Sequence, residues 1–514
     1  MTRGHEVFAK TIEEMDLLPV FGNPGTTEIP MLRSVKRYVL TLLDSISVGM
    51  ADGRSQYLGK PSLVNLHTMP GVGHSMGFIN TAKMNRSPVI ITSGQQDTRH
   101  QFYEPLLSHD LRSLVGSAVK YFYEIRDADD IEPAIKRAAR ISMEAPRGPV
   151  FLSFPMNLMD EDSLYTSLDF SIPGNNQVDM AGAAEVMNEI ERAGNPAIIF
   201  GSEVDEYGAI DRAAELVEKL GIPAYGEPLS SRSPYDTSRK GFAGDLLPAS
   251  TAINVQLLQH DLIVMIGASV TLYPYLPSKL FQGKKVIYAG LNPDNRYGRC
   301  YVSNPKLFIE KLLELAKRKG NIGEPASIGI ESEAARERRR MGIGYVAYRI
   351  RREFQGYTIV DESISNSPAV RRIIGYADRS YFNAKSGMLG WGVPAAAGIA
   401  MENSRVLAII GDGSLMYTIQ SLYTMKRYSI PLKIVVLNNG GYSILKSFSK
   451  SFYPEMENAE MFSPATDIEG ISNAFGVEAR RAGQDLEDLK WLREGIEPKL
   501  LVVDMDRTVQ KLFP

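Results

Sequence analysis

Ten short apolar segments recur along the 514-residue chain, and stretches with helical spacing separate them. Typical examples are SLVNL at 62–66, RVLAII at 405–410 and LKIVVLN at 432–438. Strands that are apolar on both faces, with helices between them, are typical of parallel sheets covered on both sides. The sequence therefore predicts an α/β protein. The other seven segments are 88–92, 149–154, 196–200, 262–268, 285–290, 357–361 and 500–505.

Two stretches break this alternation. Residues 161–180 carry Pro, Gly and Asn without a clear period, and residues 318–342 are polar and strongly charged at their end. We interpret both stretches as linkers. They predict three doubly wound parallel-sheet domains, over 1–165, 178–322 and 340–514, each of a size that suits one hydrophobic core.

Composition narrows the classes of partner. The net charge is −3, with Lys and Arg spread along the chain, which argues against nucleic acid or an anionic membrane as the main partner. Cys300 is the single cysteine, so an intrachain disulfide and a cysteine metal cage are excluded. Apolar residues near the N-terminus have helical spacing rather than the pattern of a signal peptide, and no apolar run approaches the ~20 residues of a membrane span. We therefore expect a cytoplasmic protein.

The most informative motif is GDGS at 411–414, which directly follows the apolar segment 405–410. Asp412 is therefore expected at the carboxyl end of a parallel strand, where α/β sheets bind ligands. The glycines on either side allow a sharp turn and a close approach to a ligand. A helix that begins near Ser414 would offer its free N–H groups to a phosphate.

A second polar group belongs with this motif. The predicted strand 432–438 is followed by Asn439, 27 residues after Asp412. One βαβ unit takes about 30 residues, so this spacing places the two side chains side by side. Carboxylate, amide and backbone carbonyl oxygens suit Mg²⁺, which takes one or two protein ligands and completes its shell with phosphates and waters. A capping Asp and an Asn-Gly turn are common alone, but the complete unit favours a metal–diphosphate site.

This unit resembles the signature of thiamine diphosphate (ThDP) enzymes, and the resemblance extends over nearly the whole chain. It is closest to the benzoylformate decarboxylases of the pyruvate decarboxylase and acetolactate synthase superfamily. The other motifs that carry it are VFGNPGTTEIPML at 20–32, VGMADG at 48–53, NLHTMPGVGHSMG at 65–77, GPVFLSFPMNLMDED at 148–162 and SGMLGWGVPAAAGIA at 386–400.

The resemblance implies an arrangement of the domains. The first and third domains would bind the pyrimidine and diphosphate ends of ThDP, and the middle domain would be structural. Active sites would lie between the subunits of a homodimer or homotetramer. We expect no flavin, because the middle domain has no Gly-rich dinucleotide fingerprint after its strands.

The resemblance also assigns roles to residues. Asp412, Asn439 and the carbonyl of Gly441 match the ligands of Mg²⁺ (or Ca²⁺). Leu389 matches the apolar residue that wedges beneath the cofactor and holds it bent, although without the resemblance it would be an ordinary core residue. Gly387 matches the carbonyl that accepts from the pyrimidine amino group. The further cofactor contacts are Ser365, Gly413, Ser414, Tyr442 and Ile444.

Asp44 departs from the family pattern. The family has an activating Glu eight residues before the Asp of its ADG motif, and counting back from Asp52 gives Asp44. Asp is one methylene shorter, which is about 1.5 Å, and a misplacement near 1 Å can cost ~10²-fold in rate. A helix N-cap is the alternative role for Asp44.

The substrate side of the site rests on His67 and Thr26. His67 follows the segment 62–66 where the family has an active-site His, and imidazole is the natural proton carrier near pH 7. Thr26 stands at the position of a substrate-contacting Ser, although a turn hydroxyl is the alternative. Pro274 stands where a second active-site His is expected, and Leu445 stands where pyruvate decarboxylase has an acid.

The resulting pocket favours a bulky or apolar 2-oxo acid over pyruvate. Non-oxidative decarboxylation of such an acid is the leading interpretation. An acetolactate synthase-like carboligase, another ThDP lyase or a C–C hydrolase are alternatives, as is a ThDP-binding protein with little catalysis. The residues predicted to line the pocket are Tyr273, Tyr275, Tyr442, Ile444 and Leu445.

Overall fold

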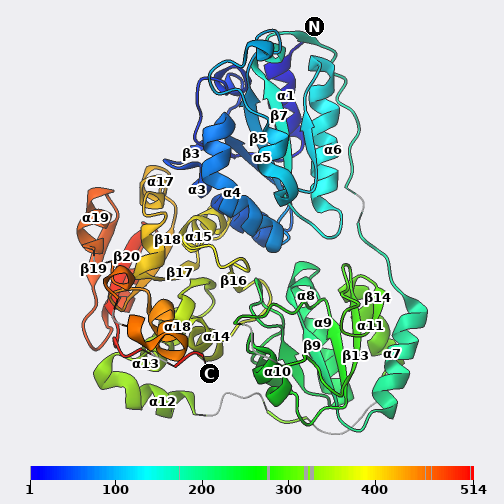
Figure 1. Ribbon diagram of the computed structural model, residues 1–514, viewed down its shortest axis with the longest axis vertical. Coiled ribbons are helices and arrows are strands. Elements are labelled where there is room, and N and C mark those ends of the chain that lie inside the picture. Colours follow the sequence, from blue (N-terminus) through cyan, green and yellow to red (C-terminus); the bar gives the residue numbers. More distant parts are fainter. Residues whose placement is uncertain are drawn as a thin grey trace.

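The computed structural model describes residues 2–172, 174–274, 278–317, 322–324, 329–457, 459–464, 466–509 and 511–513. Within these residues the chain forms three six-stranded sheets, one after another along the sequence. The first lies at the top of Figure 1, the second at the lower right and the third at the lower left, each flanked by helices. The predicted α/β class with three parallel sheets is confirmed.

The first sheet has the strand order β3-β2-β4-β5-β7-β6, and its strands pair in parallel. A short antiparallel pair, β1 (Thr2–Arg3) with β8 (Asp162–Ser163), ties its two chain ends together. Its strands are β2 (Val20–Gly22), β3 (Tyr38–Leu40), β4 (Ser62–Leu66), β5 (Val89–Gln95), β6 (Phe122–Glu124) and β7 (Val150–Pro155). Its helices are α1 (Gly4–Glu14), α2 (Ile29–Leu32), α3 (Asp44–Leu58), α4 (Thr68–Met84), α5 (Leu111–Val115) and α6 (Ile131–Met143).

The second sheet has the order β11-β10-β9-β12-β13-β14, again parallel. Its strands are β9 (Pro196–Phe200), β10 (Ala224–Gly226), β11 (Phe242–Asp245), β12 (Leu262–Ile266), β13 (Lys285–Gly290) and β14 (Arg299–Val302). Its helices are α7 (Met180–Arg192), α8 (Ser202–Glu206), α9 (Ile210–Leu220), α10 (Ser250–Gln256) and α11 (Pro305–Leu315).

The third sheet has the order β16-β15-β17-β18-β20-β19, also parallel. Its strands are β15 (Thr358–Glu362), β16 (Tyr381–Asn383), β17 (Val406–Gly411), β18 (Leu432–Asn438), β19 (Glu478–Arg481) and β20 (Lys499–Asp504). Its helices are α12 (Ile330–Glu337), α13 (Ile343–Glu353), α14 (Ser367–Ile374), α15 (Gly392–Ala400), α16 (Asp412–Met416), α17 (Ser421–Arg427), α18 (Ser443–Phe452), α19 (Ile468–Ala474) and α20 (Asp488–Arg493).

Each of the ten predicted segments overlaps a strand, but two other expectations need correction. The helix expected after GDGS is divided into α16 and α17. Between them the hydroxyl of Thr418 donates to the carbonyl of Gly390 at 2.6 Å, which ties this stretch to another loop. The stretch expected as the second linker contains α12, and Ile330 and Met341 are buried in the core of the third domain.

The first and third domains meet directly through α3 and α15 (Figure 1). A Cβ on Gly53 would overlap the backbone of Ala395, and a Cβ on Gly398 would overlap the backbone of Met50. The two helices therefore cross at backbone contact, which only glycine allows. None of the helices described is long and apolar enough to cross a membrane.

Candidate active site

The carboxyl end of the third sheet brings Asp412 to the loop that follows β18. The parallel register pairs Gly411 of β17 with Leu437 of β18, so both strands end at the same level. Asp412 is buried as the first residue of α16, and the backbone N–H groups of Gly440 and Gly441 hydrogen-bond to its carboxylate. Asp412 therefore meets the loop that carries Asn439, as the 27-residue spacing predicts. Burial raises the pKa of Asp412, although these backbone bonds oppose that effect.

Asn439 lies in the same loop with an unsatisfied polar atom. Its Oδ1 is buried and has no hydrogen-bond partner. Such an atom costs free energy in a protein interior unless a ligand or water satisfies it. Asn438 behaves differently, because its Nδ2 donates to Asp504 at 2.6 Å. Of the Asn pair, Asn439 is the residue with a buried oxygen that a ligand could satisfy.

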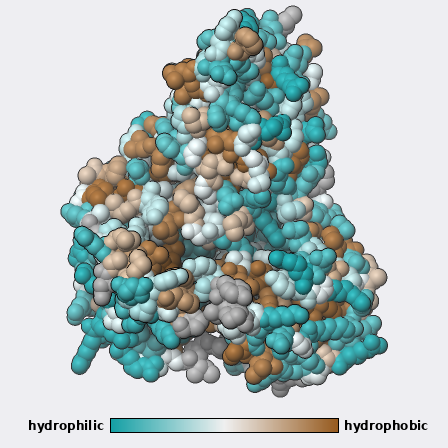
Figure 2. Space-filling view, in the orientation of Figure 1, coloured by the Kyte–Doolittle hydropathy of each residue, from teal (hydrophilic) through white to brown (hydrophobic). Residues whose placement is uncertain are grey.

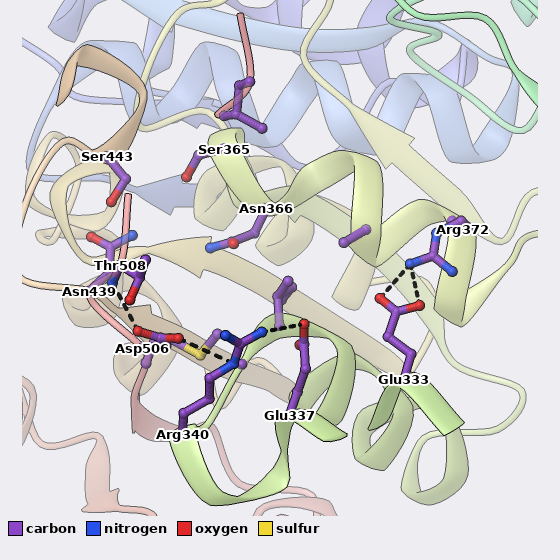
Figure 3. Close-up of a pocket in the computed structure, with 15 residues that line it drawn as sticks. Glu333, Glu337, Arg340, Ser365, Asn366, Arg372, Asn439, Ser443, Asp506 and Thr508 are labelled. Carbon is purple, nitrogen blue, oxygen red and sulfur yellow. Dashed lines mark hydrogen bonds and ion pairs between the residues drawn. The ribbon is translucent and has the colours of Figure 1, made fainter. Parts of the chain in front are cut away.

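A polar cavity of about 300 Å³ opens beside this loop (Figure 3). Ser365, Asn439 and Ser443 converge on it from three different segments, the loop after β15, the loop after β18 and the start of α18. Arg340 and Arg372 stand further out and are already paired with acids, Arg340 with Glu337 and Asp506, and Arg372 with Glu333. The cavity therefore offers hydroxyl and amide groups rather than free charge.

These groups fit a divalent cation only together with an anionic ligand. The part of the chain that the structure describes holds no cluster of three His, Cys, Asp or Glu side chains suited to a metal. The hard oxygens at hand are the carboxylate of Asp412, the unsatisfied Oδ1 of Asn439 and backbone carbonyls such as that of Gly441. This set is typical of Mg²⁺ that shares its remaining positions with phosphates and water.

A loop over residues 384–392, here termed the strap, carries the two predicted pyrimidine-side residues, Gly387 and Leu389. Gly387 and Gly390 have φ values of +73° and +87°, and a Cβ on Gly390 would lie 2.6 Å from that of Tyr417. Leu389 is half-buried. The strap thus depends on glycine to make its turns.

Glu362, the last residue of β15, holds the far end of the strap. Its buried carboxyl group accepts from the backbone N–H groups of Gly390 and Gly392, and it also interacts with the hydroxyl of Ser414. Burial raises the pKa of Glu362 to about 8, although these hydrogen bonds oppose the effect. The strap is therefore joined to the helix that begins at Asp412.

The carboxyl end of the first sheet gathers Asp44 and His67. Asp44 is the first residue of α3, Leu43 occupies the N-cap position, and no side-chain cap is formed, so the alternative role as an N-cap is not supported. Asn23 Nδ2 and the backbone N–H of His67 contact the Asp44 carboxylate at 3.4 and 3.3 Å. Burial raises the pKa of Asp44, against the effect of these bonds.

Glu28 completes this cluster and was missed by the sequence analysis. It is fully buried, and His67 Nδ1 lies 2.8 Å from its Oε2. The hydrogen bond with Glu28 raises the pKa of His67, although burial opposes it. Thr27 donates to the same carboxylate at 2.8 Å, whereas Thr26 is exposed. The signal in the sequence was an acid two positions after Thr26, inside a motif already selected.

Asp44 and the strap lie at different stretches of α4 within one chain. Asp44 lies beside Gly71, whereas Met388 lies beside Gly77 and the Ser386 hydroxyl hydrogen-bonds that of Thr81 at 2.7 Å. Along the helix axis, Gly77 lies six residues or about 9 Å from Gly71, and Thr81 lies ten residues or about 15 Å from it. The acid–base cluster of a chain and the strap of the same chain therefore contact different parts of α4.

The structure brings together only some of the residues that were predicted to line the substrate pocket. Tyr442 packs over Gly413, Ile444 is half-buried, and Leu445 is 42% exposed on α18. The ring of Tyr273 stacks on Phe448 of α18 with centroids 6.3 Å apart. Pro274 follows it in the chain, and Tyr275 lies outside the described residues. Apolar and phenolic groups from two domains therefore meet at α18.

Comparison with known proteins gives a consistent answer. Three family models match: the N-terminal TPP binding domain of thiamine pyrophosphate enzymes over 2–113, the central domain over 183–312 and the C-terminal TPP binding domain over 367–503. The chain is 31% identical to benzoylformate decarboxylase of Pseudomonas aeruginosa, over 93% of each protein. It is 23% identical to the acetolactate synthase large subunit of Lactococcus lactis, over 98% of this chain and 92% of that protein.

A solved structure agrees with these matches. The thiamine diphosphate-dependent 4-hydroxybenzoylformate decarboxylase of Rhodococcus jostii superposes with a TM-score of 0.90 and 28% identity. The match covers 99% of this chain and 100% of that one. The three domains described above are therefore present in the same arrangement in a protein of known cofactor dependence.

Proposed function

Because this chain belongs to the thiamine pyrophosphate (ThDP) enzyme family, in its decarboxylase and carboligase branch, we propose that it catalyses the Mg²⁺-dependent, non-oxidative decarboxylation of an aromatic 2-oxo acid. Two relatives are named for decarboxylation of benzoylformate and 4-hydroxybenzoylformate. The apolar and phenolic groups around α18 are compatible with an aryl substituent.

The third domain would hold the diphosphate end of the cofactor. Asp412, Asn439 and the carbonyl of Gly441 would supply the protein ligands of Mg²⁺, while Ser365 and Ser414 would contact the diphosphate. The observation that supports the metal is the buried Oδ1 of Asn439, which has no hydrogen-bond partner and belongs to the loop whose backbone contacts the buried Asp412. When bound, ThDP supplies the nucleophile and the electron sink of the reaction.

The first domain would supply the proton chemistry. Asp44 would bond to the pyrimidine ring, with its raised pKa favouring the shared proton that this contact needs. His67, held by Glu28, would carry a proton at the substrate side. The one observation that favours decarboxylation over carboligation is this His67–Glu28 pair, because a proton donor ends the reaction at the aldehyde.

We further propose that each active site forms between two subunits. The separation of Asp44 from the strap of its own chain along α4 supports this arrangement. The face in Figure 2 is largely hydrophilic with separate hydrophobic patches. Three apolar side chains in the loop after β5, Phe102, Tyr103 and Leu106, are 89%, 71% and 86% exposed, which suits burial by a second copy.

The cytoplasmic location and the absence of flavin stay predictions.

A carboligase is the second candidate. Leu445 favours it by placing an apolar group where an acid would donate a proton, and the similarity to acetolactate synthase also favours it.

One experiment separates the candidates. The protein is incubated with ThDP, Mg²⁺ and a panel of aryl and alkyl 2-oxo acids, and products are scored as aldehyde, acyloin or none. Aldehyde from aryl acids supports the proposal, mainly acyloin supports the carboligase, and no product supports a binding protein with little catalysis.

A further inference from the structure

The middle domain carries a carboxylate that the proposed mechanism does not use. Glu227 follows β10 at the carboxyl end of the second sheet and is 1% exposed. It accepts hydrogen bonds from the backbone N–H groups of Ser202 and Ser269 and from their hydroxyls, at 2.5 to 3.1 Å. Ser202 follows β9 and Ser269 follows β12, so three strand ends converge on this side chain.

The partner of Glu227 comes from another domain. Lys385 Nζ lies 3.1 Å from its Oε1 and donates to the Ser269 hydroxyl at 2.7 Å. The Lys385 side chain is 10% exposed, so this is a buried ion pair between domains. Although burial opposes it, the charge of Lys385 leads the interactions that lower the pKa of Glu227. The carboxylate is therefore held ionised against the ammonium group.

Lys385 belongs to the strap and stands two residues before Gly387. Its backbone N–H donates to Asn85 of the first domain at 3.0 Å, and the indole N–H of Trp391 donates to Asp52 of the same domain at 2.7 Å. Glu362 holds the opposite end of the strap within the third domain. All three domains thus contact this loop. The middle domain contacts it through the bonds of Lys385 to Glu227 and Ser269, and it also accepts a backbone hydrogen bond from Asn383, just before the strap, at the carbonyl of Ser231.

We propose that Glu227 is a positioning residue of the active site: through Lys385 it fixes the start of the strap, and so the middle domain sets the position of Gly387 and Leu389 against the cofactor. This inference rests on the proposed function. Without Glu227, the Lys385 ammonium group would be left buried without its carboxylate, and it would leave for water. The strap would then occupy the position that binds the cofactor for only part of the time. The affinity for the cofactor would fall in proportion to the fraction of molecules in that position.

The chain offers a matched control. Glu206, at the end of α8, pairs with Arg147 of the first domain at 3.2 Å, and their side chains are 7% and 13% exposed. This pair also joins two domains and is also buried, but neither residue belongs to the strap. Glu206→Gln therefore reports the cost of losing an ion pair between domains, and Glu227→Gln reports that cost together with any effect on the strap.

The test uses the full-length parent protein and the variants Glu227→Gln, Lys385→Met, Lys385→Arg and Glu206→Gln. Hydrogen exchange of the peptide over 384–392 is measured without added cofactor. ThDP affinity in Mg²⁺ is measured by the quenching of Trp391, one of two tryptophans and itself in the strap. We expect strap exchange to rise, and the dissociation constant of ThDP to increase about tenfold, in Glu227→Gln and Lys385→Met.

The two controls should differ from these variants. Glu206→Gln should lower the melting temperature without changing strap exchange, and Lys385→Arg should keep near-parental values because it keeps the charge. Equal strap exchange and equal ThDP affinity in Glu227→Gln and Glu206→Gln would overturn the inference. If Glu227→Gln does not fold, Lys385→Met gives the same decision. A parent protein that does not bind ThDP would instead contradict the proposed function, which separates the two failures.

Discussion

The first and third domains place polar side chains at equivalent points, the carboxyl ends of parallel strands, but the chemistry differs. In the first domain, Asp44, Glu28 and His67 form a cluster of ionisable groups, in which the two acids are buried and His67 is half-buried. In the third domain, buried Asp412 stands among backbone N–H groups, including those of Gly440 and Gly441 in the loop that carries Asn439. The same topology therefore supports proton transfer at one sheet and binding of a charged group at the other.

The effect of burial on pKa sharpens this contrast. Burial raises the pKa of both Asp44 and Asp412. At Asp412 a bound cation would reverse this effect, since positive charge favours the carboxylate. At Asp44 the raised pKa is useful as it stands, because a proton shared with a base needs a carboxyl group that is not fully ionised. A substitution of Asp412 should therefore impair cofactor binding, and a substitution of Asp44 should impair proton transfer.

The largest expected effect is the loss of cofactor binding in Asp412→Ala. Removing this carboxylate takes away the one charged protein ligand proposed for Mg²⁺, so the diphosphate would have no anchor. Titration of ThDP followed by tryptophan fluorescence should show no saturation, with an unchanged far-ultraviolet circular dichroism spectrum. Asn438→Ala is the matched control, because Asn438 is bonded to Asp504 and should bind ThDP normally. Tight binding by Asp412→Ala in a chelator would contradict the metal assignment.

Asp44→Ala should give the opposite result, with cofactor bound but chemistry lost. We expect exchange of the C2 proton of ThDP and turnover to fall by at least ~10²-fold, a size typical of losing a positioned acid–base group. Deuterium exchange followed by NMR measures this directly. Asp44→Glu restores the family side chain: it should speed exchange if the backbone is placed as in the relatives, and slow it if the longer side chain overpacks the site. Parental exchange in Asp44→Ala would remove Asp44 from the mechanism.

Mixing these two inactive variants tests whether the two clusters act across subunits. In a mixed dimer one site carries both substitutions and the other carries neither, so random exchange of subunits should restore about a quarter of the parental activity. The measurement is turnover after the variants are unfolded and refolded together, against each variant treated alone. No recovery from well-folded mixed dimers would mean that Asp44 and Asp412 serve one site within one chain.

The strands were predictable because a strand buried on both faces leaves a continuous apolar run that no other element explains. Edge strands such as β6, β14 and β19 are half-buried or exposed and lack this pattern, so they were not predicted. The polar composition of α12 suggests a linker, because its acids and Arg336 obscure two buried positions, Ile330 and Ala334. Local composition does not reveal which polar segment packs against a core.

The site shows the same limit. The contact between Asp412 and the Asn439 loop could be predicted because a βαβ unit has a nearly fixed length. Glu28 could not be predicted in this way, because its role depends on His67, which lies 39 residues away in the sequence. The choice between Thr26 and Thr27 depends on which hydroxyl points inward, and spacing does not contain that information.

The smallest expected effect concerns Glu28→Gln, which should shift a pH profile rather than abolish activity. Glu28 raises the pKa of His67 above its ordinary value of 6.5 and burial opposes it, so the variant should have a lower His67 pKa. If protonated His67 donates to the substrate, the fall in turnover with rising pH should begin at a lower pH in the variant than in the parent. Near pH 8 the variant should be slower than the parent by about tenfold or less.

The same pair should affect stability. Since the pKa of His67 is higher in the folded state, the pair stabilises the fold fully below pH 6.5 and loses this contribution as pH rises through the folded pKa. The stability difference between parent and variant should therefore be largest at acid pH and shrink above it.

Turnover and denaturant unfolding, each measured as a function of pH, test the two predicted directions of change. Thr26→Ala, a substitution at an exposed residue beside the cluster, is the control. Profiles that coincide for parent and Glu28→Gln would show that Glu28 only supports the loop, and that the proton donor lies elsewhere.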